Sequence, residues 1–218
     1  MNSLIPLGQK AKEASKALNM ASGELKNSAL THIAEALREN REEIISANAK
    51  DIAAAKENGM SASMLDRLSL DQKRVFAMAE GVEALCKLDD PVGKVLDKTV
   101  RPNGIEITKI SVPMGVIGII YEARPNVTSD AAAISLKAGS AVILRGGKEA
   151  FNSNMKTVEV MRAAVKKAGL PEDSIQLVTD ISRQSATDLM TLNGYLDVLI
   201  PRGGAGTVCY MFLVQFLF

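Results

Sequence analysis

The sequence predicts an α/β fold in which N-terminal helices precede an open, mostly parallel sheet. Two observations lead to this prediction. Before residue 90, apolar side chains recur at the i, i+3, i+4, i+7 spacing of a buried helical face. After Pro113, short apolar runs alternate with helical segments, which is the pattern of parallel strands joined by helices. No internal repeat or low-complexity linker interrupts the pattern.

Three amphipathic helices are expected in the first segment. One has four apolar side chains on a single face: Leu30, Ile33, Ala34 and Leu37. The next has a similar stripe: Ile45, Ala49 and Ile52. It ends at Asn58-Gly59, which is typical of a helix C-terminus. The third begins at a capping box formed by Ser69 and Gln72. Its apolar side carries Val75, Met78, Ala79, Val82 and Leu85.

An extended arm is predicted over residues 100–112. Pro102-Asn103-Gly104 has the composition of a turn, and Ile105 and Ile107 alternate with polar residues as in a strand. Because the segment mixes polar and apolar residues, we expect a hairpin that lies on a surface or contacts another subunit.

Beyond Pro113 we expect four short apolar strands: Gly115–Tyr121, Ala141–Leu144, Ile175–Val178 and Val198–Ile200. The continuous apolar runs of the first two indicate strands that are buried in a parallel sheet. The helices expected between them begin near Ser129, Ser153 and Ser185. Together these elements predict an open sheet with helical crossovers.

The composition excludes several classes of protein. The 218 residues include 26 Lys and Arg against 25 Asp and Glu, and a net charge of +1 argues against a nucleic-acid partner. One histidine, His32, and two cysteines, Cys86 and Cys209, are too few for a zinc finger or a disulfide scaffold. No segment reaches the ~18 consecutive apolar residues of a membrane span, and no signal peptide is apparent. We therefore expect a cytoplasmic protein with no membrane partner.

Three loops of unusual composition follow the predicted strands. Glu122–Asn126 follows the first strand, Arg145–Lys148 the second and Pro201–Gly206 the last. The carboxyl ends of parallel strands share one edge, where ligands bind. Glycine lets backbone amides approach a ligand, and Arg and Lys attract phosphate. The loops therefore predict a site for a nucleotide or a phosphorylated ligand; the alternative is that each is only a tight strand-to-helix turn.

Standard phosphate motifs and nucleophile motifs are absent from the sequence. Gly147-Lys148 is followed by Glu149, so it is not a P-loop, and Gly204-Ala205-Gly206 lacks the final glycine of the dinucleotide fingerprint. A nucleotide would therefore bind in a less common way. Neither cysteine lies near a histidine or a glycine-rich elbow. We interpret Cys86 as a small buried apolar residue and His32 as a surface or boundary residue.

A resemblance to a known family is carried by three segments. They are SVPMGVIGIIYEARPNVTSDAAAISLKAGSAVILRGGKEA, SANAKDIAAAKENGMSASMLDRLSL and DVLIPRGGAG. These segments resemble the glutamate-5-semialdehyde dehydrogenases, also called γ-glutamyl phosphate reductases, of the aldehyde dehydrogenase superfamily. The resemblance implies a Rossmann-like sheet of the aldehyde dehydrogenase type. It also implies a reaction of proline biosynthesis, the NADPH-dependent reduction of L-glutamyl 5-phosphate to L-glutamate 5-semialdehyde with release of phosphate.

The resemblance also implies roles for individual residues. In this superfamily a cysteine thiolate attacks the acyl carbon, and hydride reduces the resulting thioester. Asn126 matches the asparagine whose amide helps to bind the oxyanion. Arg145 and Lys148 match positions near the adenosine ribose, where a cation suits the 2′-phosphate of NADP. The residues expected to contact NADP(H) are Arg145, Gly146, Gly147, Lys148, Arg202, Gly203 and Gly204.

The resemblance ends at Gly206. The family continues into a catalytic domain with the nucleophilic cysteine, whereas this sequence continues as TVCYMFLVQFLF, which carries no charge. We therefore expect an NADP-binding domain over residues 1–206, including the 100–112 arm, and an aberrant apolar tail over 207–218, with the catalytic domain missing. The chain alone would then be inactive, and the intact enzyme would be a homo-oligomer with a small-molecule substrate. The alternative is a non-catalytic nucleotide-binding or subunit-interaction fragment.

Overall fold

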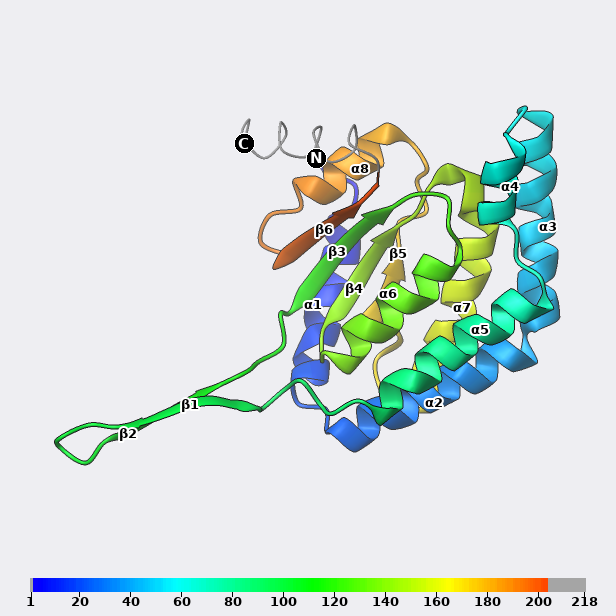
Figure 1. Ribbon diagram of the computed structural model, residues 1–218. Coiled ribbons are helices and arrows are strands. Elements are labelled where there is room, and N and C mark those ends of the chain that lie inside the picture. The colour runs from blue at the N-terminus through cyan, green and yellow to red at the C-terminus, as the bar shows by residue number, and fades with distance from the viewer. Residues whose placement is uncertain (1, 204–218) are drawn as a thin grey trace.

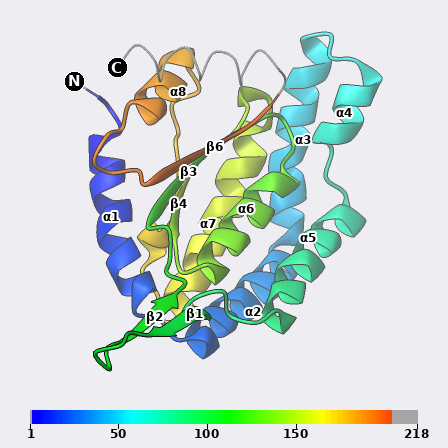
Figure 2. The same ribbon diagram turned by 60° about the vertical axis from the view of Figure 1, so that its left-hand side comes forward.

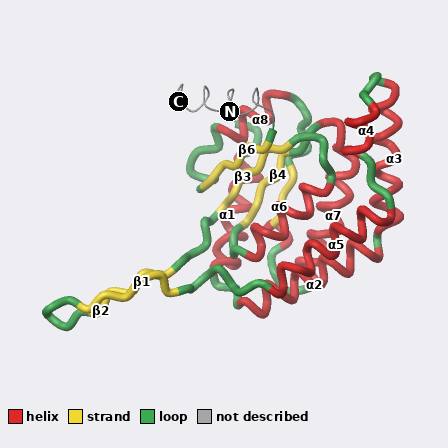
Figure 3. Tube along the Cα trace, viewed as in Figure 1, coloured by secondary structure: helices red, strands yellow, loops and turns green. Residues whose placement is uncertain are grey.

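A four-stranded parallel sheet forms the centre of the molecule (Figures 1 and 3). In this computed structural model, which describes residues 2–203, the strand order is β5-β4-β3-β6. β3 (Val116–Tyr121) pairs in parallel with β4 (Ala141–Arg145) on one side and with β6 (Val198–Arg202) on the other. β5 (Ile175–Leu177) pairs with the free side of β4. The predicted open, parallel α/β sheet is therefore confirmed.

Helices cover both faces of this sheet (Figure 2). Those before the sheet are α1 (Ile5–Asn19), α2 (Gly23–Glu39), α3 (Arg41–Glu57), α4 (Ala62–Leu68) and α5 (Gln72–Ala84). Those between the strands are α6 (Asn126–Lys137), α7 (Phe151–Lys167) and α8 (Arg183–Met190). Short 3₁₀ turns are Leu85–Lys87, Lys148–Ala150 and Glu172–Ser174. α1 packs on one face of the sheet and α6 and α7 on the other, and α2, α3 and α5 form an outer layer over α6 and α7.

The buried faces of the first helices agree only partly with the predicted stripes. The predicted stripe of α2 is buried, and so are four of the five apolar positions predicted for α5. In α3, however, the buried residues are Ile44, Asn48, Asp51 and Ala55 rather than the predicted Ile45, Ala49 and Ile52. The prediction was wrong because it considered only apolar side chains, whereas two of the buried positions are polar and hydrogen-bonded.

Two helix starts differ from the prediction. The N-cap of α5 is Asp71, whose carboxylate accepts a hydrogen bond from the Arg74 backbone N–H at 2.7 Å. The predicted capping box is therefore wrong, because α5 begins at Gln72 and the Asp71 carboxylate, not the Ser69 hydroxyl, caps its first turn. α6 begins at Asn126 rather than Ser129 because Pro125 directly precedes it with a helical φ of −59°. The first turn of α6 therefore lies nearer the end of β3 than the sequence indicated.

A close contact fixes the start of β3. The Asp197 carboxylate accepts hydrogen bonds from the Val116 backbone N–H at 2.8 Å and from Lys12 Nζ at 2.7 Å. Gly115 has a φ of +100°, and a Cβ there would collide with this carboxylate. Glycine at this position therefore belongs to the turn into β3, and the strand begins at Val116.

β6 lies at the edge of the described sheet. The strand predicted at Val198–Ile200 is present, but its residues are only half-buried or exposed. Within residues 2–203 β6 pairs only with β3, which leaves its other side open.

An antiparallel hairpin projects from the body of the molecule (Figure 1). It consists of β1 (Val95–Val100) and β2 (Glu106–Ile110), and its turn is closed by the Gly104 N–H, which donates to the Arg101 carbonyl at 2.9 Å. The first strand begins at Val95, so the hairpin starts before the predicted 100–112 segment. Every residue of both strands is exposed.

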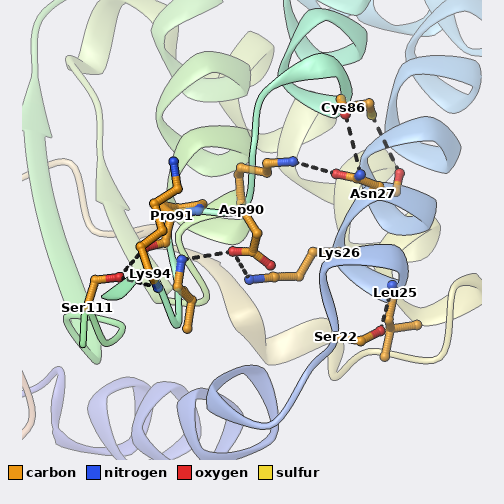
Figure 4. A network of polar contacts seen from close by, with 11 residues as sticks. Ser22, Leu25, Lys26, Asn27, Cys86, Asp90, Pro91, Lys94 and Ser111 are labelled. Carbon is orange, nitrogen blue, oxygen red and sulfur yellow. Dashed lines mark hydrogen bonds and ion pairs between the residues drawn. The ribbon is translucent and has the colours of Figure 1, made fainter. Parts of the chain in front are cut away.

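Polar contacts join the base of the hairpin to α2 (Figure 4). Lys26 Nζ donates to Asp90 Oδ1 at 2.7 Å. The same oxygen accepts the Val92 backbone N–H at 3.0 Å, and Ser111 Oγ donates to the Pro91 carbonyl at 2.6 Å. The points where the two strands leave the body are therefore held in place.

Candidate functional site

The carboxyl ends of β3, β4 and β6 bring the predicted loops to one edge of the sheet. The chain runs from β3 through β4 to β5 on one side and then crosses to β6 on the other side of β3. Open α/β sheets bind ligands at such a reversal of strand order. A Cβ at Gly147 would lie 3.0 Å from the backbone nitrogen of Ala123, and Tyr121 is the register partner of Arg202. The three loops are therefore neighbours, as the parallel order of the strands predicts.

One pocket opens between the ends of β3 and β6. Its volume is ≈ 230 Å³, and it is lined by Tyr121, Glu122, Arg124, Val127, Arg202 and Gly203. Two guanidinium groups in one concave site can hold an anionic ligand group through paired N–H donors. Of the residues predicted to contact a cofactor, Arg202 and Gly203 lie here. Gly204 lies outside the described residues.

Arg145 joins the loop after β4 to the loop after β5. Its Nη2 donates to the backbone carbonyls of Ile181 and Ser182 at 3.3 and 2.9 Å. Burial lowers the pKa of this guanidinium, and the charges of Glu149 and Asp180 oppose that effect. The Nε of Arg145 is buried without a hydrogen-bond partner among residues 2–203. The Arg145 guanidinium therefore donates hydrogen bonds to the backbone through Nη2, while its Nε–H has no acceptor among residues 2–203.

The two glycines after Arg145 are required by packing. A Cβ at Gly146 would collide with the Asn154 amide and lie 3.1 Å from the Tyr121 ring. A Cβ at Gly147 would lie 2.9 Å from Glu149 Oε2 and close to the loop after β3. The structure thus gives these glycines a role in loop contact in addition to the predicted approach to a ligand. Lys148 is exposed and forms no ion pair within residues 2–203.

A buried chain of hydrogen bonds supports the loops from below. The Tyr121 hydroxyl lies 2.7 Å from Thr128 Oγ1, and Thr128 Oγ1 donates to Asn154 Oδ1 at 2.8 Å. Burial raises the pKa of the Tyr121 hydroxyl, although the hydrogen bond to Thr128 opposes the shift. These residues come from β3, α6 and α7, so they hold the two loops against each other. No local sequence pattern links the three residues, so the sequence did not predict this network.

Asn126 lies in a second and larger pocket. Its volume is ≈ 380 Å³, and it lies between α4, α5 and the N-terminus of α6. Asn126 Nδ2 donates to Asp130 Oδ2 at 3.2 Å. Arg124 lines both pockets, so they adjoin at the loop after β3. The predicted oxyanion residue Asn126 therefore lies in a different pocket from Arg202 and Gly203, and Arg124 lines both pockets.

No sequence pattern predicted the other charged residues that line this second pocket with Arg124: Asp66, Arg67, Arg74 and Asp130. Burial raises the pKa of the Asp130 carboxyl, while the hydrogen bond from Asn126 and the charge of Arg202 act in the opposite direction. Arg67 and Asp130 are far apart in the sequence and share no motif. The packing of α5 against α6 brings them to one pocket, so no local signal could have found them.

The other candidate residues lie elsewhere. Cys86 is half-buried in the 3₁₀ turn after α5, with Sγ 3.6 Å from the Asn27 carbonyl, and it lines neither pocket. His32 lies at the surface boundary of α2, with Nδ1 2.8 Å from the Ser28 carbonyl. Cys209 and the 207–218 tail lie outside the described residues.

Two classes of site have no support in the described part of the chain. Within residues 2–203, no group of three or more His, Cys, Asp or Glu side chains is arranged to hold a metal ion. No helix in the same range combines the length and apolarity that a transmembrane segment needs.

Curated relatives match this chain over nearly all of its length. A γ-glutamyl phosphate reductase of Carboxydothermus hydrogenoformans is 56% identical over 208 residues, covering 95% of this chain and 50% of the relative. One from Clostridium perfringens is 57% identical over 207 residues, with the same coverage. The chain thus spans about half the length of the curated relatives it matches.

Solved structures give the same result. The crystal structure of γ-glutamyl phosphate reductase from Thermotoga maritima matches with a TM-score of 0.94 and 41% identity, over 96% of this chain and 50% of that chain. The Saccharomyces cerevisiae enzyme matches with a TM-score of 0.89 and 32% identity, over 97% and 54%. The profile of the aldehyde dehydrogenase family matches residues 7–200. This chain belongs to the aldehyde dehydrogenase family.

Proposed function

We propose that this chain forms the cofactor-binding half of a cytoplasmic γ-glutamyl phosphate reductase. The reaction is the NADPH-dependent reduction of L-glutamyl 5-phosphate to L-glutamate 5-semialdehyde and phosphate. One observation carries the proposal: the pocket with Arg202 and Gly203 adjoins the pocket with Asn126, and Arg124 lines both. A cofactor and an acyl phosphate bound in these pockets would meet at the end of β3. Similarity to reductases over 95% of the chain supports the proposal.

The residues at the sheet edge fit a phosphorylated dinucleotide. Arg202 and Gly203 would hold the pyrophosphate, since a guanidinium and an accessible backbone suit that group. Arg145, with its unsatisfied Nε–H, and the exposed Lys148 would face the adenosine ribose and its 2′-phosphate. When bound, the nicotinamide would supply hydride to the acyl carbon of the substrate.

The substrate side depends on Asn126. Its amide N–H would donate to the oxygen of the acyl carbon as negative charge develops there. Asp130 holds this amide at 3.2 Å, and the Tyr121–Thr128 hydrogen bond holds the first turns of α6 against β3. Within residues 2–203 the described thiol, Cys86, lines neither pocket, so we assign the attacking thiolate to the part of the reductase that this chain does not span.

Reconstitution tests the proposal. The chain is co-expressed with the C-terminal half of the Carboxydothermus hydrogenoformans reductase, and NADPH formation is followed with semialdehyde, phosphate and NADP⁺. We expect phosphate-dependent turnover by the two halves and none by the 218-residue chain alone. Asn126→Ala should lower kcat by about 10²–10³-fold, as for other oxyanion donors. Cys86→Ala should leave kcat unchanged.

Two outcomes would contradict the proposal. Turnover by the chain alone that Cys86→Ala or Cys209→Ala abolishes would place the nucleophile within this chain. Tight NADPH binding without turnover in the reconstituted pair would favour a non-catalytic nucleotide-binding or subunit-interaction fragment. The exposed hairpin is the observation that favours this second candidate.

A further inference from the structure

The pocket around Asn126 holds charges that the fold does not pair. Arg74 is engaged, because its Nη2 lies 2.7 Å from Asp66 and its Nη1 donates to the Ser69 carbonyl at 2.9 Å. Arg67 and Arg124, in contrast, form no ion pair or hydrogen bond through their side chains within residues 2–203. Both line the pocket. The pocket therefore presents two unpaired cations beside one cation that is fixed by the protein.

Asp130 provides a negative charge in the same pocket. It is half-buried, and its carboxylate accepts a hydrogen bond only from the Asn126 amide among residues 2–203. The α5 residue that faces it is Gly81, where a Cβ would lie 4.0 Å from Asp130 Oδ1, so no side chain covers the carboxylate from that side. The charge of Arg202 acts on this carboxylate, but Asp130 forms no ion pair within residues 2–203. A partly buried carboxylate with no ion-pair partner is unfavourable. A positively charged ligand group in the pocket would relieve this cost.

We infer that this pocket recognises the amino-acid end of the substrate, with Asp130 accepting the α-ammonium group and Arg67 pairing with the α-carboxylate. Arg124, which also lines the pocket between β3 and β6, would face the phosphate end, beside Asn126. This inference rests on the proposed function, because it takes γ-glutamyl phosphate as the ligand. It adds residues that select an α-amino acid over other acyl phosphates.

The charge distribution favours a zwitterionic ligand over a simple anion. Inorganic phosphate or another plain anion could pair with Arg67 and Arg124, but it would place more negative charge beside Asp130. A ligand with an ammonium group beside a carboxylate, and with a phosphate at its other end, offers a group of opposite charge to each of Asp130, Arg67 and Arg124. Removing only the amino group from the ligand therefore tests whether the pocket prefers a zwitterion to a simple anion.

Binding of two matched ligands tests the inference. The first is L-2-amino-5-oxo-6-phosphonohexanoate, in which CH₂ replaces the bridging oxygen of the acyl phosphate, and the second is its analogue without the amino group. Affinities for the 218-residue chain are measured by calorimetry. We expect the amino ligand to bind about ten- to a hundredfold more tightly, as charge-assisted contacts allow. The ratio of the two affinities is independent of the folded fraction, because both ligands encounter the same preparation.

Three variants locate the effect. Asp130→Asn should reduce the affinity ratio towards one, and Arg67→Gln should weaken both ligands by about tenfold or more while keeping the ratio. Arg101→Gln, in the exposed turn of the hairpin, is the matched arginine control and should change neither value. An affinity ratio near one in the unmodified chain, an unchanged ratio in Asp130→Asn, or no detectable binding would overturn the inference.

This experiment separates the inference from the proposed function. It requires no turnover and no second half of the enzyme. Discrimination between the ligands without reductase activity after reconstitution would support the amino-acid pocket and count against the reaction. Reductase activity with no discrimination would support the reaction and refute the assignment of Asp130 and Arg67.

Discussion

The Lys26 ammonium and the Asp90 carboxylate form an ion pair of 2.7 Å between α2 and the base of the hairpin (Figure 4). The Lys26 side chain is 1% exposed, whereas that of Asp90 is 29% exposed. A Cβ at Gly23 would lie 2.8 Å from Asp90 Oδ2, so glycine at the start of α2 leaves room for this carboxylate. The pair therefore anchors the hairpin. Because the two side chains differ in exposure, replacing one should change the free energy of unfolding more than replacing the other.

Removing Asp90 should destabilise the chain more than removing Lys26. Asp90→Ala leaves a buried ammonium without its partner, at a cost of about 3 kcal/mol. Lys26→Met should cost less, because Asp90 can then be hydrated. Urea denaturation followed by circular dichroism measures both. Glu13→Ala, which removes an exposed pair with Lys16, is the control and should change the free energy of unfolding by less than about 0.5 kcal/mol. Equal losses for Asp90→Ala and Glu13→Ala would contradict the prediction.

The same pair predicts a pH dependence. Burial raises the pKa of the Asp90 carboxyl, but hydrogen bonds from Lys26 and the Val92 N–H, together with the Lys26 charge, leave it lowered. A group with a lowered folded-state pKa contributes stability above its unfolded pKa of about 4 and loses it as the pH falls through the folded value. Stability should therefore fall below about pH 4, and less steeply in Asp90→Asn. The prediction would be refuted if the free energy of unfolding of the unmodified chain and that of Asp90→Asn changed equally with pH.

Asp51 in α3 should be essential for the start of α7. Its carboxylate accepts the backbone N–H groups of Asn152 and Ser153 at 3.1 and 2.8 Å, and both side chains also donate to it. Asp51→Ala leaves these donors without their acceptor and should cost roughly 2–4 kcal/mol. The matched control is Asp89→Ala, whose side chain is 90% exposed. Thermal denaturation distinguishes them, and similar midpoints would contradict the role of Asp51.

The hairpin should mediate self-association. Its apolar side chains are 47–63% exposed: Val95, Leu96, Val100, Ile105, Ile107 and Ile110. Exposed apolar surface on paired strands favours contact with another chain. We expect the 218-residue chain to form oligomers or aggregates at micromolar concentration, measured by light scattering. Ile107→Asp should reduce the average mass, and Thr108→Asp on the same strand should reduce it less. A stable monomer would contradict the prediction.

Lys148 should favour NADPH over NADH. A charge-assisted contact with the 2′-phosphate contributes roughly 1.5–3 kcal/mol, or about ten- to a hundredfold in affinity. Titrating NADPH and NADH with the chain and following cofactor fluorescence gives the dissociation constant of NADH divided by that of NADPH. Lys148→Glu should lower this ratio, while Lys109→Glu in the hairpin should not alter it. Equal affinities for both cofactors in the unmodified chain, or no effect of Lys148→Glu, would refute the prediction.

The strands of the sheet and the location of its ligand edge can be predicted from the amino-acid sequence alone. Apolar runs such as the one ending at Tyr121 are local signals, because burial on both faces leaves no place for polar residues. Parallel strands then require their carboxyl ends to share an edge, so Arg145 and Arg202 could be placed there without coordinates. The resemblance to the reductases added Asn126, whose position depends on a motif that is continuous in sequence.

In contrast, the packing of elements distant in sequence determines which side chains share a pocket and which find hydrogen-bond partners within the fold. Asn48 and Asp51 are buried because partners distant in sequence hydrogen-bond to them, so a pattern based on apolar residues cannot find them. Arg67 and Asp130 line one pocket because α5, which follows α4, packs against α6. Contacts of this kind depend on the distance between elements in space, which the local periodicity of a sequence does not encode.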